Sequence, residues 1–155
     1  MSETDNWLVH DHSWYEALML RCQLAVAGED WGAADCDFSD LIARLKTHMA
    51  MEEEVLYPAY EAASHAPQGP TTALRQEHDA IVRLVQDMVR LLKSRDSERV
   101  LEGLAQLEQL MFKHHEKEED IFLPMASHIL TAKRDEVLAQ LDSFDTSKTT
   151  RRWDV

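Results

Sequence analysis

The chain repeats a set of potential metal-binding residues at one fixed spacing. Each member of the set recurs 66 positions later, and the equivalent pairs are His12 and His78, His48 and His114, Glu52 and Glu118, and Pro58 and Pro124. The flanking residues repeat as well, since HMAMEEEVLYP begins at His48 and HHEKEEDIFLP begins at His114. Such a chain is expected to build two half-sites that face one ion cluster. Four imidazoles and two carboxylates are the ligands of a non-haem dinuclear metal site.

Length and charge restrict the classes of protein that fit. A chain of 155 residues is expected to form one domain with a sizeable core. The net charge of −13 argues against non-specific binding to nucleic acid or to anionic membranes, whose phosphates would repel it. No basic and apolar signal stands at the N-terminus, and no apolar run approaches the roughly 20 residues that span a bilayer. Two cysteines do not make a disulfide framework, so we expect a soluble, cytoplasmic protein.

The pattern of apolar residues predicts an all-α protein. Three breaks, GEDWG, SHAPQGPTT and SRDS, separate stretches in which apolar residues recur with the period of a helix. The short links at the first and third breaks are typical of antiparallel hairpins, so the sequence predicts an antiparallel up-down-up-down four-helix bundle. The predicted helices span 5–27, 33–63, 72–93 and 97–129. We expect residues 1–130 to form the bundle and residues 131–155 to form a C-terminal extension, with a weak helix at 133–141 and a polar tail.

Hairpin geometry brings the repeated residues to one level of this bundle. The midpoint between His12 and His48 is residue 30, inside the first turn, and the midpoint between His78 and His114 is residue 96, inside the third break. Residues equidistant from the turn of an antiparallel hairpin lie side by side. Each glutamate follows a histidine by four residues and therefore shares its helix face. Six side chains are thus predicted to point at one interior region.

The chemistry of this set favours a cluster of cations. Nitrogen and oxygen donors without thiolate suit iron or manganese, and suit zinc less well. Six inward polar groups would be very costly in a dry core without cations to neutralise them. The ferritin-like di-iron arrangement, which uses Glu-x-x-His on two helices, is excluded because no histidine has an acidic residue three positions before it.

The pattern resembles the hemerythrin-like, or HHE cation-binding, domain. Residues 8–125 carry the resemblance: a lone histidine on the first and third helices, and His-x-x-x-Glu with a later proline on the second and fourth. The resemblance implies two iron ions bridged by both glutamates and by an oxo or hydroxo group. It implies that one ion is bound by His12 and His48, the other by His78 and His114, and that Glu52 and Glu118 bridge them.

Two differences separate the sequence from the oxygen-carrying hemerythrins. Those proteins have a second histidine one turn away on the third helix, whereas Leu74 and Val82 stand at these positions here. Their last carboxylate is an aspartate five residues after its histidine, whereas Glu118 follows His114 by four. The site is therefore expected to be nearly symmetric, as in the bacterial and regulatory members of the family.

The sequence leaves three functional classes open. The first is a protein that binds or senses a small oxidant or gas, namely oxygen, nitric oxide or peroxide, and this is the class that we predict. The second is a redox enzyme or repair protein that turns over peroxide or nitric oxide, or donates iron to damaged iron–sulfur clusters. The third is a structural metal site. A protein partner or an electron donor fits the first two classes, and the oligomeric state is left open.

Several residues near the predicted ligands could have either a structural or a functional role. His115 and Glu119 are also four apart, but only His114 and Glu118 match the first repeat in their distance to proline, so His115 is predicted on a flank of the helix. Glu16 lies four residues after His12, and a solvated helix edge is favoured for it over an extra ligand or an outer acceptor.

Other side chains are treated in the same way. His10 is predicted at the surface rather than as a ligand. Tyr15 could donate a hydrogen bond to metal-bound oxygen, although packing is favoured, and Tyr57 is predicted to shape and pack the helix before a proline. Cys22 and Cys36 are predicted to be two buried free thiols rather than a redox-active pair.

Overall fold

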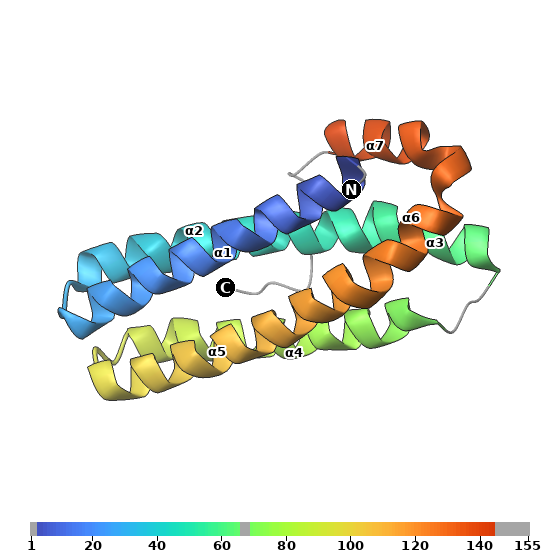
Figure 1. The fold of residues 1–155 in the computed structure, drawn as a ribbon. Coiled ribbons are helices and arrows are strands. Elements are labelled where there is room, and N and C mark those ends of the chain that lie inside the picture. Colours follow the sequence, from blue (N-terminus) through green and yellow to red (C-terminus); the bar gives the residue numbers. More distant parts are fainter. Residues whose placement is uncertain (1–2, 66–68, 145–155) are drawn as a thin grey trace.

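A computed structural model describes the backbone of residues 3–65 and 69–144 and the side chains of residues 12–65 and 69–144. The secondary structure in these ranges is helical, without strands (Figure 1). No helix in the described ranges is long and apolar enough to cross a membrane. The elements are α1 (Glu3–Ala27), α2 (Trp31–Met51), η1 (Glu52–Leu56), α3 (Tyr57–Ser64), α4 (Pro70–Leu92), α5 (Ser97–Lys117), η2 (Glu118–Phe122), α6 (Leu123–Ile129), η3 (Thr131–Lys133) and α7 (Arg134–Asp142).

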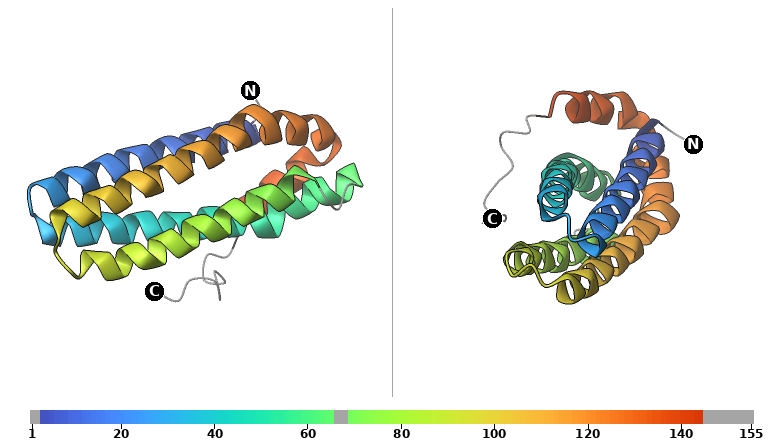
Figure 2. Two further views of the ribbon diagram at one scale, coloured as in Figure 1. Left: turned by 90° about the horizontal axis from the view of Figure 1, so that it is seen from below. Right: turned by 90° about the vertical axis from the view of Figure 1, so that its left-hand side faces the viewer.

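The long helices pack side by side as a bundle. α1 lies along α2, α4 lies along α5, and α1 also contacts α5, as the views in Figures 1 and 2 agree. The predicted helix 33–63 corresponds to α2, η1 and α3 in succession, and the predicted helix 97–129 corresponds to α5, η2 and α6. The all-helical prediction and the positions of the long helices are therefore confirmed.

The 66-residue repeat extends to the turns of the bundle. Asp30 and Asp96 are equivalent, and each accepts a hydrogen bond from a backbone N–H at the start of the following helix, which caps it. The residue before each cap, Glu29 or Arg95, has a positive φ of 56° or 55°. Both predicted turn centres are thus confirmed, and they fix where the following helices begin.

Each glutamate of the repeat opens a π-helical segment. In η1 the N–H of Tyr57 bonds to the carbonyl of Glu52, five residues back, and the equivalent bond closes η2. Pro58 follows at once, and the second repeat has a proline at the same place. Proline has no N–H to donate, and its ring clashes with the carbonyl four residues earlier in an α-helix. A wider turn accommodates the ring without breaking the helix.

The wider turn changes which side chains face the core. An α-helical period continued from His114 and Glu118 predicts Ile121 on the apolar face of its helix, but 55% of it is exposed, so this prediction is wrong. Because a π turn takes more residues than an α turn, a strict α-helical period misplaces side chains after Glu118. Phe122, one residue on, is buried instead.

The core lies in two clusters on either side of the ligand level. The larger fills the bundle between the first and third turns, and Gly103 lets α5 approach Met88 of α4 closely there. The smaller gathers around η1 and η2 and includes Val137 and Leu141 of α7. The predicted weak helix 133–141 is thus present as α7, and it packs on the end of the bundle formed around η1 and η2.

The two cysteines are free, as predicted. Cys22 is buried in the larger core, but Cys36 is exposed, so the prediction that both thiols are buried is wrong for Cys36. The core-facing residues of this part of α2 are Ala34, Phe38 and Leu41, and Cys36 lies off that face.

Candidate metal centre

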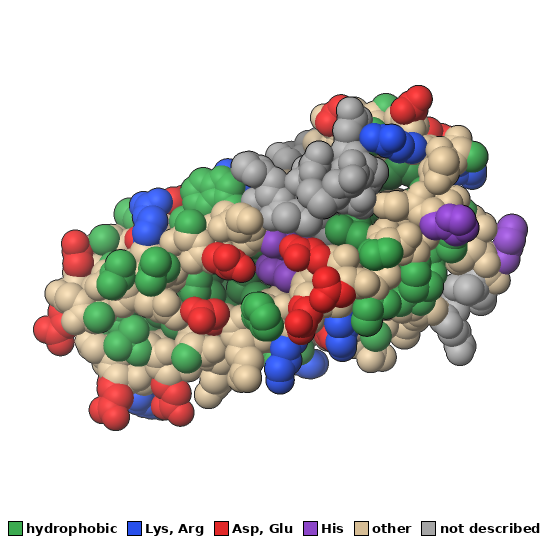
Figure 3. Space-filling model, in the orientation of Figure 1, with side chains coloured by type: hydrophobic (Ala, Val, Ile, Leu, Met, Phe, Trp, Pro, Cys, Tyr) green, Lys and Arg blue, Asp and Glu red, His purple; other side chains and the backbone are tan. Residues whose placement is uncertain are grey.

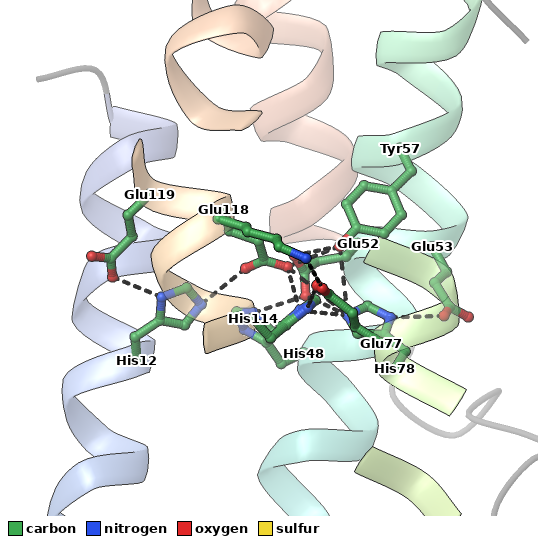
Figure 4. Close-up of polar contacts among 11 residues, drawn as sticks. His12, His48, Glu52, Glu53, Tyr57, Glu77, His78, His114, Glu118 and Glu119 are labelled. Atoms are coloured by element: carbon green, nitrogen blue, oxygen red, sulfur yellow. Dashed lines mark hydrogen bonds and ion pairs between the residues drawn. The ribbon is translucent and has the colours of Figure 1, made fainter. Parts of the chain in front are cut away.

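The structure brings the six repeated side chains together at one level of the bundle (Figure 4). All six are buried, and none is more than 4% exposed. They come from six elements, with the histidines on α1, α2, α4 and α5 and the glutamates at the starts of η1 and η2. Their placement is what the repeat predicts, and their role as ligands remains a proposal.

Each glutamate lies between two imidazoles. Oε1 of Glu52 is 3.0 Å from Nε2 of His48 and 3.4 Å from Nε2 of His78. The two oxygens of Glu118 lie 2.8 Å from Nε2 of His114 and 3.1 Å from Nε2 of His12. Each carboxylate therefore joins a histidine of one repeat to a histidine of the other. This is the geometry that a carboxylate bridging two ions requires.

The outer nitrogens of three histidines are held by further carboxylates. Nδ1 of His12 is 2.8 Å from Glu119, and Nδ1 of His78 is 2.8 Å from Glu53. Glu53 and Glu119 are themselves 66 residues apart, so they are equivalent in the repeat. A carboxylate at Nδ1 accepts that proton and leaves a lone pair on Nε2 directed at the centre.

The third of these acceptors is Glu77. Its carboxylate lies 3.0 Å from Nδ1 of His114 and also accepts from Lys117. Burial acts to raise the pKa of Glu77, but hydrogen bonds from His114 and Lys117 outweigh it and lower the pKa. Glu77 therefore stays ionised and holds the His114 ring in place.

Tyr57 adds a hydroxyl to the inner cluster. Its oxygen lies 2.8 Å from Oε1 of Glu118 and 3.1 Å from Oε2 of Glu52, so it donates to one or the other carboxylate. Burial, followed by the charges of both glutamates, raises the pKa of Tyr57 well above its usual value. Tyr57 is thus a neutral donor to either glutamate in turn, a role beyond the packing that its sequence position predicts.

Four buried atoms of the cluster have no hydrogen-bond partner. They form two facing pairs, Nε2 of His12 with Oε2 of Glu118 and Nε2 of His48 with Oε1 of Glu52. Each pair is 3.0–3.1 Å apart without making a hydrogen bond. Buried acceptors that face one another repel, and such groups are rarely left unsatisfied. A cation between them would satisfy all four atoms.

The spacing of the other two histidines fits the same conclusion. Nε2 of His78 lies 3.0 Å from Nε2 of His114. Two nitrogens that bind one ion at about 2.1 Å and at right angles are about 3.0 Å apart. The donor set and its spacing therefore fit a metal cluster, with nitrogen and oxygen ligands only.

Without a metal, protons take the place of the cation. Burial acts to lower the pKa of His114, but Glu118 and Glu77 outweigh it and raise the pKa to about 9. His78 behaves likewise, since hydrogen bonds to Glu118, Glu52 and Glu53 overcome burial and raise its pKa. Burial would raise the pKa of Glu118, yet the neighbouring His114 lowers it well below its usual range. The centre therefore attracts positive charge strongly.

The remaining candidates lie around the cluster. The ring of His115 stacks on His12 with centroids 3.6 Å apart, so this flanking residue contacts a predicted ligand. Glu16 is exposed, as predicted. The hydroxyl of Tyr15 donates to the carbonyl of Arg44 at 3.0 Å, which confirms its packing role. The side chain of His10 lies outside the described residues.

Two of the three outer acceptors, Glu53 and Glu119, were missed because they stand in acidic runs. Glu53 and Glu119 each follow a predicted ligand directly, and such runs are usually solvated faces. Their equivalence in the repeat was the available signal. Tyr57 gives no such signal, because the equivalent residue is Leu123.

Comparison with known proteins agrees with this geometry. Comparison with curated proteins and with solved structures gives no significant match. The sequence profile of the Hemerythrin HHE cation binding domain matches residues 4–126, which includes all six predicted ligands and both prolines of the repeat. The chain therefore belongs to the hemerythrin HHE cation-binding domain family.

Proposed function

We propose that the protein holds two iron ions and uses them to bind or sense a small oxidant or gas, namely oxygen, nitric oxide or peroxide. The two facing pairs of buried acceptor atoms without a hydrogen-bond partner are the observation that carries this proposal. A protein that needed only a stable core would fill this level with apolar side chains, because unpaired polar groups are costly there.

In the proposed centre, His12 and His48 bind one ion and His78 and His114 bind the other. Glu52 and Glu118 bridge them, with an oxo or hydroxo group as the third bridge. The contact of each glutamate with histidines from both repeats supports this assignment. Manganese and zinc are the competing metals.

The chain's own residues orient and isolate the site. Glu53, Glu77 and Glu119 hold three imidazole rings through Nδ1, and Tyr57 holds the bridging carboxylates. Burial of all six ligands excludes bulk water and strengthens every electrostatic interaction inside. Iron supplies coordination positions for a small molecule and electrons for its reduction.

We further propose that the bundle has an antiparallel up-down-up-down topology in residues 1–130, with residues 131–155 as an extension. The equivalent capped turns at Asp30 and Asp96 support the two hairpins. We also propose a cytoplasmic location, for which the free thiols of Cys22 and Cys36 give support.

The first test is metal analysis of aerobically purified protein together with its optical spectrum. We expect about two irons per chain, which is the family's di-iron stoichiometry, and near-ultraviolet bands that bleach on anaerobic reduction and return in air. His48→Ala and His114→Ala should each lose most of the iron. One zinc per chain, or no reversible spectrum, would leave only a structural metal role.

A second measurement separates binding from catalysis. The reduced protein is mixed anaerobically with an excess of nitric oxide or peroxide, and consumption of the small molecule is followed. Stoichiometric binding supports a binding or sensing protein. Many turnovers per chain would instead favour the redox enzyme or repair protein.

A further inference from the structure

A groove between α1 and α5 reaches the proposed metal centre from one side. Its volume is about 850 Å³, and its lining runs from His12 to Gln23 on α1 and from Ala105 to Asp120 on α5 and η2. Of the six predicted ligands, His12 alone contributes to this lining. Figure 3 shows histidine side chains at the bottom of a hollow on this face, with acidic side chains around it.

The charged side chains that line the groove are acidic. Among the described residues, its lining includes five carboxylates beside apolar side chains and neither lysine nor arginine, and the carboxylates are those of Glu16, Glu108, Glu116, Glu119 and Asp120. Four of them are exposed at the rim, while Glu119 lies deeper and contacts Nδ1 of His12 at 2.8 Å. The carboxylates thus lead from solvent to a predicted ligand.

The opposite side of the centre is closed, and the cationic side chains on it are paired with carboxylates. The ring of Tyr57 stacks beside His78, and the Arg75 guanidinium, which pairs with Glu61, lies over that ring at 5.3 Å. Lys117 pairs with Glu77, which in turn holds His114. His78 is completely buried. A cation that approaches from this side meets a steric barrier.

We propose that the groove between α1 and α5 is the entrance to the metal centre, through which a divalent cation reaches the His12 and His48 half first. The inference rests on the proposed metal centre. Six waters around such an ion occupy roughly 180 Å³ at about 30 Å³ each, which is well below the volume of the groove. Carboxylates in a cleft raise the local concentration of cations and their rate of arrival. Access is therefore one-sided although the ligand set is nearly symmetric.

The test measures how fast the metal-free, full-length protein takes up Co²⁺, followed by visible absorption in a stopped-flow instrument. We expect uptake by the unaltered chain to slow as salt is added. The double variant E108Q/E116Q should take up Co²⁺ at least about threefold more slowly at low salt, with unchanged stoichiometry. The matched control E98Q/E136Q removes two exposed charges elsewhere and should leave the rate unchanged.

A second pair of variants tests the path itself. Ala105→Trp places a large ring in the groove, and Ser39→Trp places one at the equivalent exposed position of the first repeat. Ala105→Trp should slow both uptake of Co²⁺ and its removal by a chelator by the same factor, so the affinity stays constant. Ser39→Trp should change neither rate. Circular dichroism confirms that both variants are folded.

The outcomes separate the two proposals. If the unaltered chain takes up Co²⁺ and neither E108Q/E116Q nor Ala105→Trp changes the rate, the proposed entrance is wrong and the proposed metal centre still stands. An unaltered chain that takes up no divalent cation would overturn the metal centre and the entrance with it.

Discussion

The hydroxyl oxygen of Tyr57 lies 2.8 Å from Oε1 of Glu118, so a residue of the first repeat holds a carboxylate of the second. The equivalent of Tyr57 in the second repeat is Leu123, which has no polar atom to offer in return. One hydroxyl is therefore shared by both glutamates. The residues around the duplicated ligand set thus differ between its two halves.

Tyr57→Phe is expected to destabilise the metal-free protein. It removes a donor from two completely buried carboxylates, and the loss of such a donor costs about 1–3 kcal/mol. The measurement is the free energy of unfolding in urea. Tyr60→Phe is the control, because Tyr60 is buried on the same helix and its ring packs on Phe122. Equal losses for both variants would mean that the Tyr57 hydroxyl does not support the carboxylates.

Glu53 and Glu119 are equivalent in the repeat, and each contacts Nδ1 of a proposed ligand. The two can therefore be compared for their effect on metal affinity. Removing the partner of a metal-bound histidine typically lowers metal affinity about 10- to 100-fold. We expect Glu53→Gln to lower affinity more than Glu119→Gln, because Glu53 is 18% exposed and Glu119 is 34% exposed. Glutamine keeps an acceptor oxygen but loses the negative charge, and water already screens that charge more strongly at the more exposed site.

Competition against a chelator at equilibrium measures these affinities. The controls are Glu54→Gln and Asp120→Asn, which are equivalent to one another and directly follow the two acceptors. Both are exposed, so each should lower the affinity far less than the loss of the acceptor that it follows. A larger loss for Glu119→Gln than for Glu53→Gln would contradict the order that burial predicts.

Much of the fold was predictable because the repeat fixes distances along helices. Residues 30 and 96 lie midway between the paired histidines, and both are N-caps in the structure. Once helices and turn centres are known, hairpin geometry places all four histidines at one level. Local periodicity and equal spacing from the turns were sufficient for this part.

The remaining features depend on contacts between helices that no spacing along one helix reveals. The bond from Tyr57 to Glu118 joins residues 61 positions apart, and the bond from His12 to Glu119 joins residues 107 apart. The side on which the groove opens depends on how α1 and α5 pack against each other. The repeat predicts that the two halves of the candidate site are equivalent. The packing of the helices makes their surroundings and their access to solvent different.

The stability of the metal-free protein should fall as pH rises from about 6.5 to 9. His114 has a folded pKa of about 9, above its unfolded value of about 6.5, mainly because Glu118 and Glu77 outweigh burial. A raised pKa contributes stability that is fully present below the unfolded value and is lost as pH rises through the folded value. The pKa of His78 is raised as well and acts in the same direction.

Thermal unfolding of the metal-free chain across this pH range tests the expectation. Metal must displace the protons on these histidines, so the increase in melting temperature on metal binding should grow over the same range. His128→Gln, at an exposed histidine, should leave both trends intact. A melting temperature that stays level or rises with pH would contradict the predicted protonation of the centre.

The two thiols should differ strongly in reactivity. Burial, followed by the charges of Asp37 and Asp35, raises the pKa of Cys22 to about 11, whereas Cys36 is exposed. The thiolate is the reactive form, so at pH 8 iodoacetamide should modify Cys36 rapidly and Cys22 only after unfolding. Mass spectrometry of the native chain, the chain in denaturant and Cys36→Ser measures this without reductant. Rapid modification of the native Cys36→Ser variant would show that Cys22 is accessible. Failure of both thiols to react in denaturant would mean that they are oxidised.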